Sequence, residues 1–122
     1  MRIAIDIDDT ITHAPKFFSA LTQFIKAEII IVSFRDNLEE ALSVLQNSQI
    51  SYDKVILSND RELGRENSQG LSEWKAKVVQ KIKADVFFED MPEVIALVKP
   101  PTKVFMTIDK VMQEWVQENL SR

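Results

Sequence analysis

Three aspartates stand within four residues directly after the first apolar run, in the stretch RIAIDIDDTIT. Carboxylates this close repel one another and resist removal from water unless a cation holds them. Mg²⁺ fits best, because it takes oxygen ligands from one or two carboxylates, water and substrate phosphate. The single histidine, His13, cannot supply a zinc site. The stretch therefore predicts a magnesium ion that lets an acidic protein accept a phosphate dianion.

Other polar residues that could join these aspartates follow later apolar runs or begin a helical pattern. In an open parallel sheet, ligands bind beyond the carboxyl ends of the strands. We therefore expect carboxylates, a hydroxyl and an ammonium from separate segments to meet at one edge. The candidates are Asp6, Asp8 and Asp9, then Ser33 with Arg35, then Lys75 with Lys77, and finally Glu89 with Asp90.

The elements that must position these residues follow from the apolar pattern. Five short runs rich in Ile, Val and Phe alternate with segments whose apolar residues recur every three or four positions. The runs are typical of strands covered on both faces, and the segments of amphipathic helices. Such an order predicts an α/β fold, a three-layer α/β/α sandwich around a parallel five-stranded Rossmann-like sheet. The predicted strands are Arg2 to Ile7, Glu28 to Val32, Lys54 to Leu57, Val86 to Phe88 and Lys103 to Ile108.

Length and composition restrict the function classes. The 122 residues suit one domain, 1–122, and 45% hydrophobic with 28% charged residues is ordinary globular composition. No apolar run approaches the roughly 20 residues that span a bilayer, and we expect a cytoplasmic protein without a membrane partner. The absence of cysteine excludes disulfides and thiolate chemistry, and a net charge of −4 argues against general nucleic-acid binding. With two glycines, neither after the first run, no dinucleotide or Walker-type phosphate loop is predicted.

The stretch DIDDT matches the DxDxT signature of the haloacid dehalogenase-like (HAD) phosphohydrolases. The family's later motifs follow in order: a serine in IIIVS, a lysine in WKAKVV and an acidic pair in VFFED. The chain resembles this family over residues 2–91. Segments 11–27 and 36–71 leave no room for the cap domain that many relatives carry, so a capless form is expected. The stretches IIIVSFR and ADVFFED are loosely similar to the deoxyribonucleotidase branch.

The resemblance implies a covalent mechanism with Mg²⁺ as cofactor. Asp6 would attack phosphorus to form an aspartyl-phosphate, and Asp8 would protonate the leaving oxygen and then deprotonate the hydrolytic water. Ser33 and Lys75 would hold the phosphoryl oxygens. The metal would bind the Asp6 carboxylate, the backbone carbonyl of Asp8 and the carboxylate of Asp90.

Three assignments have alternatives. Lys75 is preferred as the catalytic lysine because apolar residues lie three, four and seven positions after it, but Lys77 remains open. Asp90 is preferred as the metal ligand, with Glu89 as the alternative or as a supporting neighbour. Arg35 could bind substrate, or it could pair with a nearby acidic residue such as Asp36 or Glu39.

The remaining motif residues have ordinary structural interpretations. Asp9 is expected to form a turn and His13 to lie on the surface, with contact to a leaving group as the alternative for His13. Thr10 could be a plain turn residue, whereas the resemblance implies that it braces the loop. Residues 61–70 are expected to form a mobile surface loop, with a partial lid as the alternative. Trp74 and Trp115 fall on apolar stripes of predicted helices, and we place both in the core.

The sequence leaves three functions to compare. Capless relatives act on large substrates or complete the pocket through a neighbouring subunit, so we expect a phosphorylated substrate, either a nucleotide or a large molecule, and a homo-oligomer is an option. The leading hypothesis is a phosphomonoesterase. The alternatives are a non-catalytic or regulatory phosphoacceptor domain, with Asp60 after the third strand as acceptor, and a degenerate phosphoryl-binding module.

Overall fold

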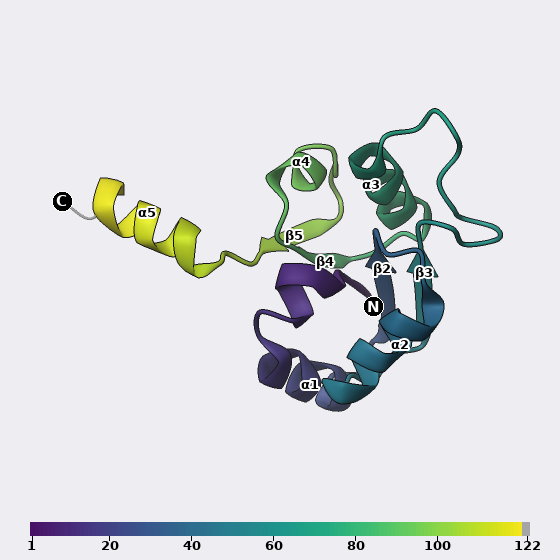
Figure 1. The fold of residues 1–122 in the computed structure, drawn as a ribbon, viewed down its shortest axis with the longest axis horizontal. Coiled ribbons are helices and arrows are strands. Elements are labelled where there is room, and N and C mark those ends of the chain that lie inside the picture. Colours follow the sequence, from purple (N-terminus) through teal and green to yellow (C-terminus); the bar gives the residue numbers. More distant parts are fainter. Residues whose placement is uncertain (121–122) are drawn as a thin grey trace.

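The computed structural model describes residues 1–120 and has five parallel strands in one sheet, ordered β3-β2-β1-β4-β5 (Figure 1). This confirms the predicted α/β class and the parallel five-stranded sheet. Parallel neighbours place all the carboxyl ends at one edge, where ligands bind in such sheets. The strands are β1 Arg2–Ile5, β2 Glu28–Ser33, β3 Lys54–Leu57, β4 Val86–Glu89 and β5 Lys103–Met106.

Helices cover both faces of the sheet and complete the three layers. Figure 1 shows α3 and α4 on one side, with α1 and α2 on the other. A short turn and α1 are the elements that join β1 to β2, and α2 is the element that joins β2 to β3. Among residues 1–120, no helix has the length and apolar content needed to cross a bilayer. The helices are η1 Ile7–Ile11, α1 Pro15–Phe24, α2 Leu38–Asn47, α3 Leu71–Lys81, α4 Pro92–Ile95 and α5 Lys110–Leu120.

Side chains along the central strands alternate between the two faces of the sheet, so the protein has two hydrophobic cores. Ile29 and Ile31 of β2 face the helices α1 and α2, whereas Ile30 and Val32 face α3 and α4. All four side chains are buried, which explains why the run EIIIV is apolar without a break. Burying each such side chain stabilises the fold by roughly 1.5–3 kcal/mol. The two cores hold the central strands, and therefore their carboxyl ends, in place.

The first strand is shorter than predicted. β1 ends at Ile5, and residues Ile7–Ile11 form a tight turn, closed by the Thr12 N–H donating to the Ile7 carbonyl at 3.1 Å, instead of extending the strand to Ile7. The backbone N–H of Asp6 still donates to the Phe88 carbonyl at 3.1 Å, and the chain turns away after it. Ile7 is buried in the turn, so its apolar character, read as strand, reflects packing against the core. β5 likewise ends at Met106 rather than at Ile108.

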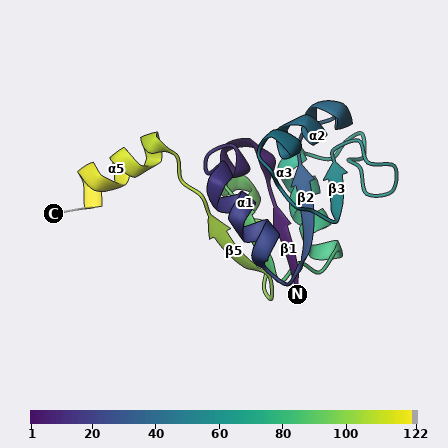
Figure 2. The ribbon, with the colours of Figure 1, turned by 90° about the horizontal axis from the view of Figure 1, so that it is seen from below.

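The last helix does not pack on the sheet. Figures 1 and 2 show α5 projecting away from the body of the protein, and none of its residues is buried. Trp115 is 54% exposed, so its predicted core position is wrong, whereas Trp74 is buried as predicted. The helical apolar pattern is present in both helices, but periodicity alone does not say whether a helix meets the sheet of its own chain.

Candidate functional site

A tight turn after β1 fixes the first carboxylate of the site. The Thr10 hydroxyl donates to Asp6 Oδ2 at 3.0 Å, and both residues are buried. Asp9 has a φ of 61°, a left-handed conformation that aspartate tolerates better than most residues. Its backbone N–H donates to Thr12 Oγ1 at 2.9 Å. Asp9 therefore forms the turn, as predicted, and Thr10 braces Asp6.

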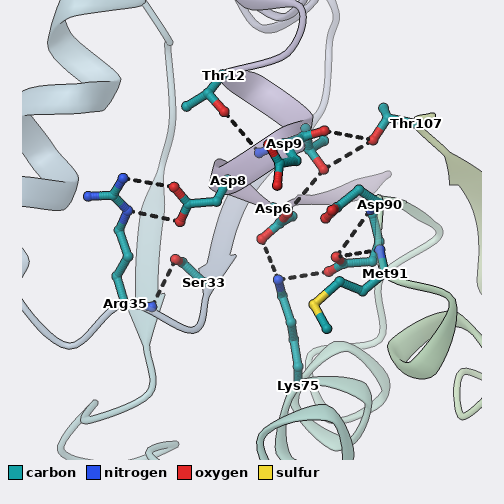
Figure 3. A network of polar contacts seen from close by, with 12 residues as sticks. Asp6, Asp8, Asp9, Thr12, Ser33, Arg35, Lys75, Asp90, Met91 and Thr107 are labelled. Atoms are coloured by element: carbon teal, nitrogen blue, oxygen red, sulfur yellow. Dashed lines mark hydrogen bonds and ion pairs between the residues drawn. The ribbon is translucent and has the colours of Figure 1, made fainter. Parts of the chain in front are cut away.

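A buried lysine connects the turn to the opposite layer of the fold. Lys75, in the first half of α3, is 1% exposed and pairs with both Asp6 and Glu89 (Figure 3). Its Nζ also lies 4.5 Å from the centroid of the Phe34 ring. Lys77, two positions later, is exposed. The geometry therefore favours Lys75 over Lys77, because only Lys75 reaches the aspartate.

Three carboxylates surround this single ammonium. Oxygens of Asp6, Glu89 and Asp90 lie within 4.8 Å of one another. Glu89 is fully buried, and its Oε2 accepts from the N–H groups of Asp90 and Met91 at 3.1 and 3.2 Å. Its Oε1 lies 2.7 Å from Lys75 Nζ without hydrogen-bond alignment, and it has no hydrogen-bond donor among residues 1–120. One ammonium therefore faces up to three carboxylates, and the Lys75 charge is the one partner of Glu89 Oε1 among residues 1–120.

This crowding changes the acidity of the carboxyl groups. Burial, followed by hydrogen bonds with Glu89 and Asp6, raises the pKa of Asp90 to about 8. Burial also raises the pKa of Asp6, which the charge of Lys75 opposes and that of Glu89 reinforces. Without a metal ion, the cluster therefore retains a proton on Asp90 near neutral pH, as expected when like charges share a site.

The raised pKa of Asp90 predicts a pH-dependent stability in metal-free buffer. The folded protein holds this proton more tightly than the unfolded chain, where an aspartate has a pKa near 4. The stabilisation is therefore fully present below about pH 4 and is lost as the pH rises through about 8. Urea titrations between pH 5 and 8.5 should show a steeper fall in the free energy of unfolding for the wild type than for Asp90→Asn. The exposed control Asp36→Asn should keep the wild-type slope, and parallel slopes for all three would contradict the prediction.

Asp8 lies on the side of Asp6 away from Asp90, and an arginine binds it (Figure 3). Arg35 Nε and Nη2 donate to the two Asp8 oxygens at 3.0 and 2.8 Å, so the contact is bidentate. The acidic partner of Arg35 is thus Asp8 rather than Asp36 or Glu39. The Asp8 side chain is 53% exposed, which leaves it open to a ligand from solvent. Ser33, at the end of β2, is buried, and its Oγ accepts from the backbone N–H of Arg35 at 3.1 Å.

Thr107, just after β5, also belongs to the site, although it is part of none of the sequence motifs. Its hydroxyl donates to the Asp9 carbonyl at 3.2 Å and lies 3.3 Å from Thr10 Oγ1. A hollow of about 180 Å³ opens here, lined by Asp9, Asp90, Thr107 and Met112 among others. The one sequence signal for Thr107 is its position near the end of the fifth apolar run, at the same edge of the sheet.

Two of the other candidates lie outside this cluster. His13 is exposed. Asp60 stabilises its own loop, because its Oδ2 accepts from the N–H groups of Glu62 and Leu63 at 3.2 and 3.1 Å. A Cβ on Gly64 would lie 2.3 Å from the Asp60 carbonyl oxygen, so this close turn requires glycine. Residues 61–70 belong to the loop that joins β3 to α3, and this loop lies on the side of α3 away from η1 (Figure 1).

Comparisons with known proteins support the fold. No protein-family model and no curated protein matches the chain. A chain in the solved "Structure of Pnkp1/Rnl/Hen1 complex" is similar, with a TM-score of 0.66 and 14% sequence identity over 88% of the present chain. The present chain spans 46% of the length of that chain. At this identity the likeness concerns the α/β architecture alone.

Proposed function

We propose that this chain is a capless member of the HAD-like phosphohydrolases and hydrolyses a phosphomonoester through an aspartyl-phosphate intermediate. The observation that carries the proposal is the position of Asp6. Thr10 donates to one of its oxygens and Lys75 pairs with the other, which fixes the carboxylate at the carboxyl edge of the sheet. A buried aspartate held by a threonine and a lysine suits a nucleophile, because its orientation is set before substrate arrives.

The proposed reaction assigns a role to each neighbour. An Asp6 oxygen forms a bond to phosphorus while the ester P–O bond breaks, and Asp8 gives its proton to the leaving oxygen. Water then attacks the same phosphorus and gives a proton to Asp8. The bond between Asp6 and phosphorus breaks, so phosphate leaves and the Asp6 carboxylate is restored. Lys75 and Ser33 hold the phosphoryl oxygens and offset their charge. Arg35, paired with Asp8 in the substrate-free protein, contacts the substrate.

The donor set fits a hard divalent cation, and Mg²⁺ is the proposed cofactor. Asp6 and Asp90 would hold it with the Asp8 backbone carbonyl, and Glu89 would hold it directly or support it. The fit rests on the three clustered carboxylates, which the single ammonium of Lys75 does not neutralise. Bound there, the ion would offset the excess negative charge and polarise a phosphoryl oxygen.

The proposed substrate is a phosphorylated molecule that reaches an open site, either a nucleotide or a larger phosphorylated partner. The short connections on either side of β2 leave no covering domain over the carboxyl edge. Asp8 and Arg35 remain partly exposed, with side-chain exposures of 53% and 27%. A site this open binds small phosphates weakly, because it excludes water poorly.

The test is to trap the intermediate on the wild-type protein. With Mg²⁺ present, the protein should hydrolyse an aryl phosphate, and EDTA should stop the reaction until Mg²⁺ is restored. Borohydride reduces an acyl phosphate to an alcohol, so reduction during turnover should convert Asp6 to homoserine, detectable by peptide mass spectrometry. Homoserine at Asp60 and not at Asp6 would instead support the regulatory phosphoacceptor. Turnover without modification of Asp6 would refute the covalent route.

A further inference from the structure

The helix α5 presents an apolar face that nothing in the described chain covers. Val111, Met112 and Trp115 are 74%, 36% and 54% exposed. Their spacing places them on one side of the helix, where they line a shallow hollow of about 430 Å³. Apolar side chains gathered on one exposed face are typical of an interaction surface.

A second apolar surface lies over β5 on the side of α1. Phe105 is 56% exposed and stacks on Phe88 with 5.5 Å between ring centroids, and Phe88 meets Phe18 of α1 at 5.3 Å. Phe17, also 56% exposed, extends this surface along α1. Figure 2, which views the protein from this side, shows β5 beside α1 rather than under it. We call Phe17, Phe88 and Phe105 the aromatic face.

The charges around the two surfaces are complementary. Lys103 lies two residues before Phe105 on β5, is exposed, and points to the same side of the sheet as Phe105. On α5, Glu118 lies beside the apolar residues, whereas Glu114 pairs with Lys110 of the same helix at 3.8 Å. Docking α5 on the aromatic face of another molecule would therefore bring opposite charges together at the rim.

The exposed area has the size that a dimer requires. A compact monomer of 14.0 kDa should expose roughly 6,700 Å². This chain exposes 7908 Å², an excess of roughly 1,200 Å². A standard interface buries about 800 Å² on each partner. Covering the excess on two chains would therefore bury more area than a stable complex needs.

The segment between β5 and α5 directs the helix outward. Only residues 107–109 connect the two elements. Thr107 is bound to the Asp9 carbonyl at 3.2 Å, and Asp109 Oδ1 accepts from the Met112 N–H at 2.8 Å, which caps the helix. Short connections held at both ends favour exchange of an element between copies over folding back.

We propose that two copies of this chain exchange their α5 helices, each helix docking on the aromatic face of the other copy. The arrangement is a twofold, isologous dimer, because the same two surfaces meet twice. The inference does not depend on the proposed function, since it rests on the apolar residues of α5 and on the aromatic face, although Met112 also borders the hollow beside Asp90.

Sedimentation equilibrium of the 122-residue chain tests the dimer. The expected mass is twice 14.0 kDa at micromolar concentration. Trp115→Glu should weaken the dimer at least about 30-fold, as for a central aromatic anchor. Gln113→Glu adds the same charge on the opposite side of α5 and should leave the dimer intact. A monomeric wild type, or equal effects of both variants, would overturn the proposal.

Cross-linking distinguishes exchange from other arrangements, because the native chain has no cysteine. Lys103→Cys and Glu118→Cys chains are mixed, re-equilibrated and treated with a short bis-maleimide. A cross-linked dimer that forms in the mixture, and does not form when either variant is treated by itself, supports exchange. An intrachain cross-link in the Lys103→Cys/Glu118→Cys double variant, with no heterodimer in the mixture, shows a helix folded back on its own sheet. That result, or a dimer without this cross-link, refutes the exchange.

Discussion

Replacing Asp6 by asparagine is expected to lower turnover of an aryl phosphate by at least about 10⁴-fold, because the amide cannot act as the nucleophile. The fold should survive. Asparagine has the same shape, its carbonyl oxygen can still accept from Thr10 or Lys75, and no charge is added to the buried cluster. The measurement is the steady-state rate in Mg²⁺, together with urea titrations that verify folding.

The matched control is Asp9→Asn, the same chemical change three residues along the chain. Asp9 is exposed, and its left-handed φ of 61° suits asparagine as well as aspartate. This variant should keep most of the activity, because the backbone N–H and carbonyl of residue 9 make the turn's hydrogen bonds. If Asp6→Asn retained wild-type turnover, or if both variants lost activity equally, Asp6 would not be the nucleophile.

Replacing Lys75 by methionine should cost about 3–5 kcal/mol of unfolding free energy at pH 8 in EDTA, because it leaves buried carboxylates without their cation. Methionine is unbranched and only one atom shorter than lysine, so loss of charge rather than loss of volume dominates. Without Lys75, the pKa of Asp6 rises further, since the lysine charge is the main influence that lowers it. The variant is therefore destabilised less at pH 5, where a proton can replace the missing charge.

Lys77→Met provides the control, because Lys77 lies on the exposed side of the same helix. Its effect on stability should stay within about 0.5 kcal/mol, as for most surface substitutions. Urea titrations at pH 5 and pH 8 measure both variants. Equal destabilisation of Lys75→Met at the two pH values would indicate a packing role rather than a charge role for this lysine.

The sequence was most informative where burial restricts residue choice. Unbroken apolar runs such as EIIIV occur in strands covered on both faces, and the structure confirms the parallel sheet they predicted. Ile7 shows the limit of this inference. An apolar residue can be buried in a turn as well as in a strand, and composition does not distinguish the two backbones.

The site shows a similar division. The rule that strand ends meet at one edge predicts from the sequence alone that Asp6, Ser33 and Asp90 lie at the same edge. The rule does not choose between Lys75 and Lys77, because both lie on the same helix, two residues apart. The choice depends on how α3 is rotated against the sheet, which packing of Trp74 and Val78 in the core determines.

Thus the local pattern of the chain determined the strands, the helices and the residues that lie at the carboxyl ends of the strands. Only the tertiary structure decided that Lys75 is buried between Asp6 and Glu89, that Thr107 joins the loop of Asp9, and that α5 leaves the sheet. The physical reason is that burial, pKa and pairing arise from residues far apart in sequence. Periodicity reports which side of an element is apolar, whereas the fold decides what that side meets.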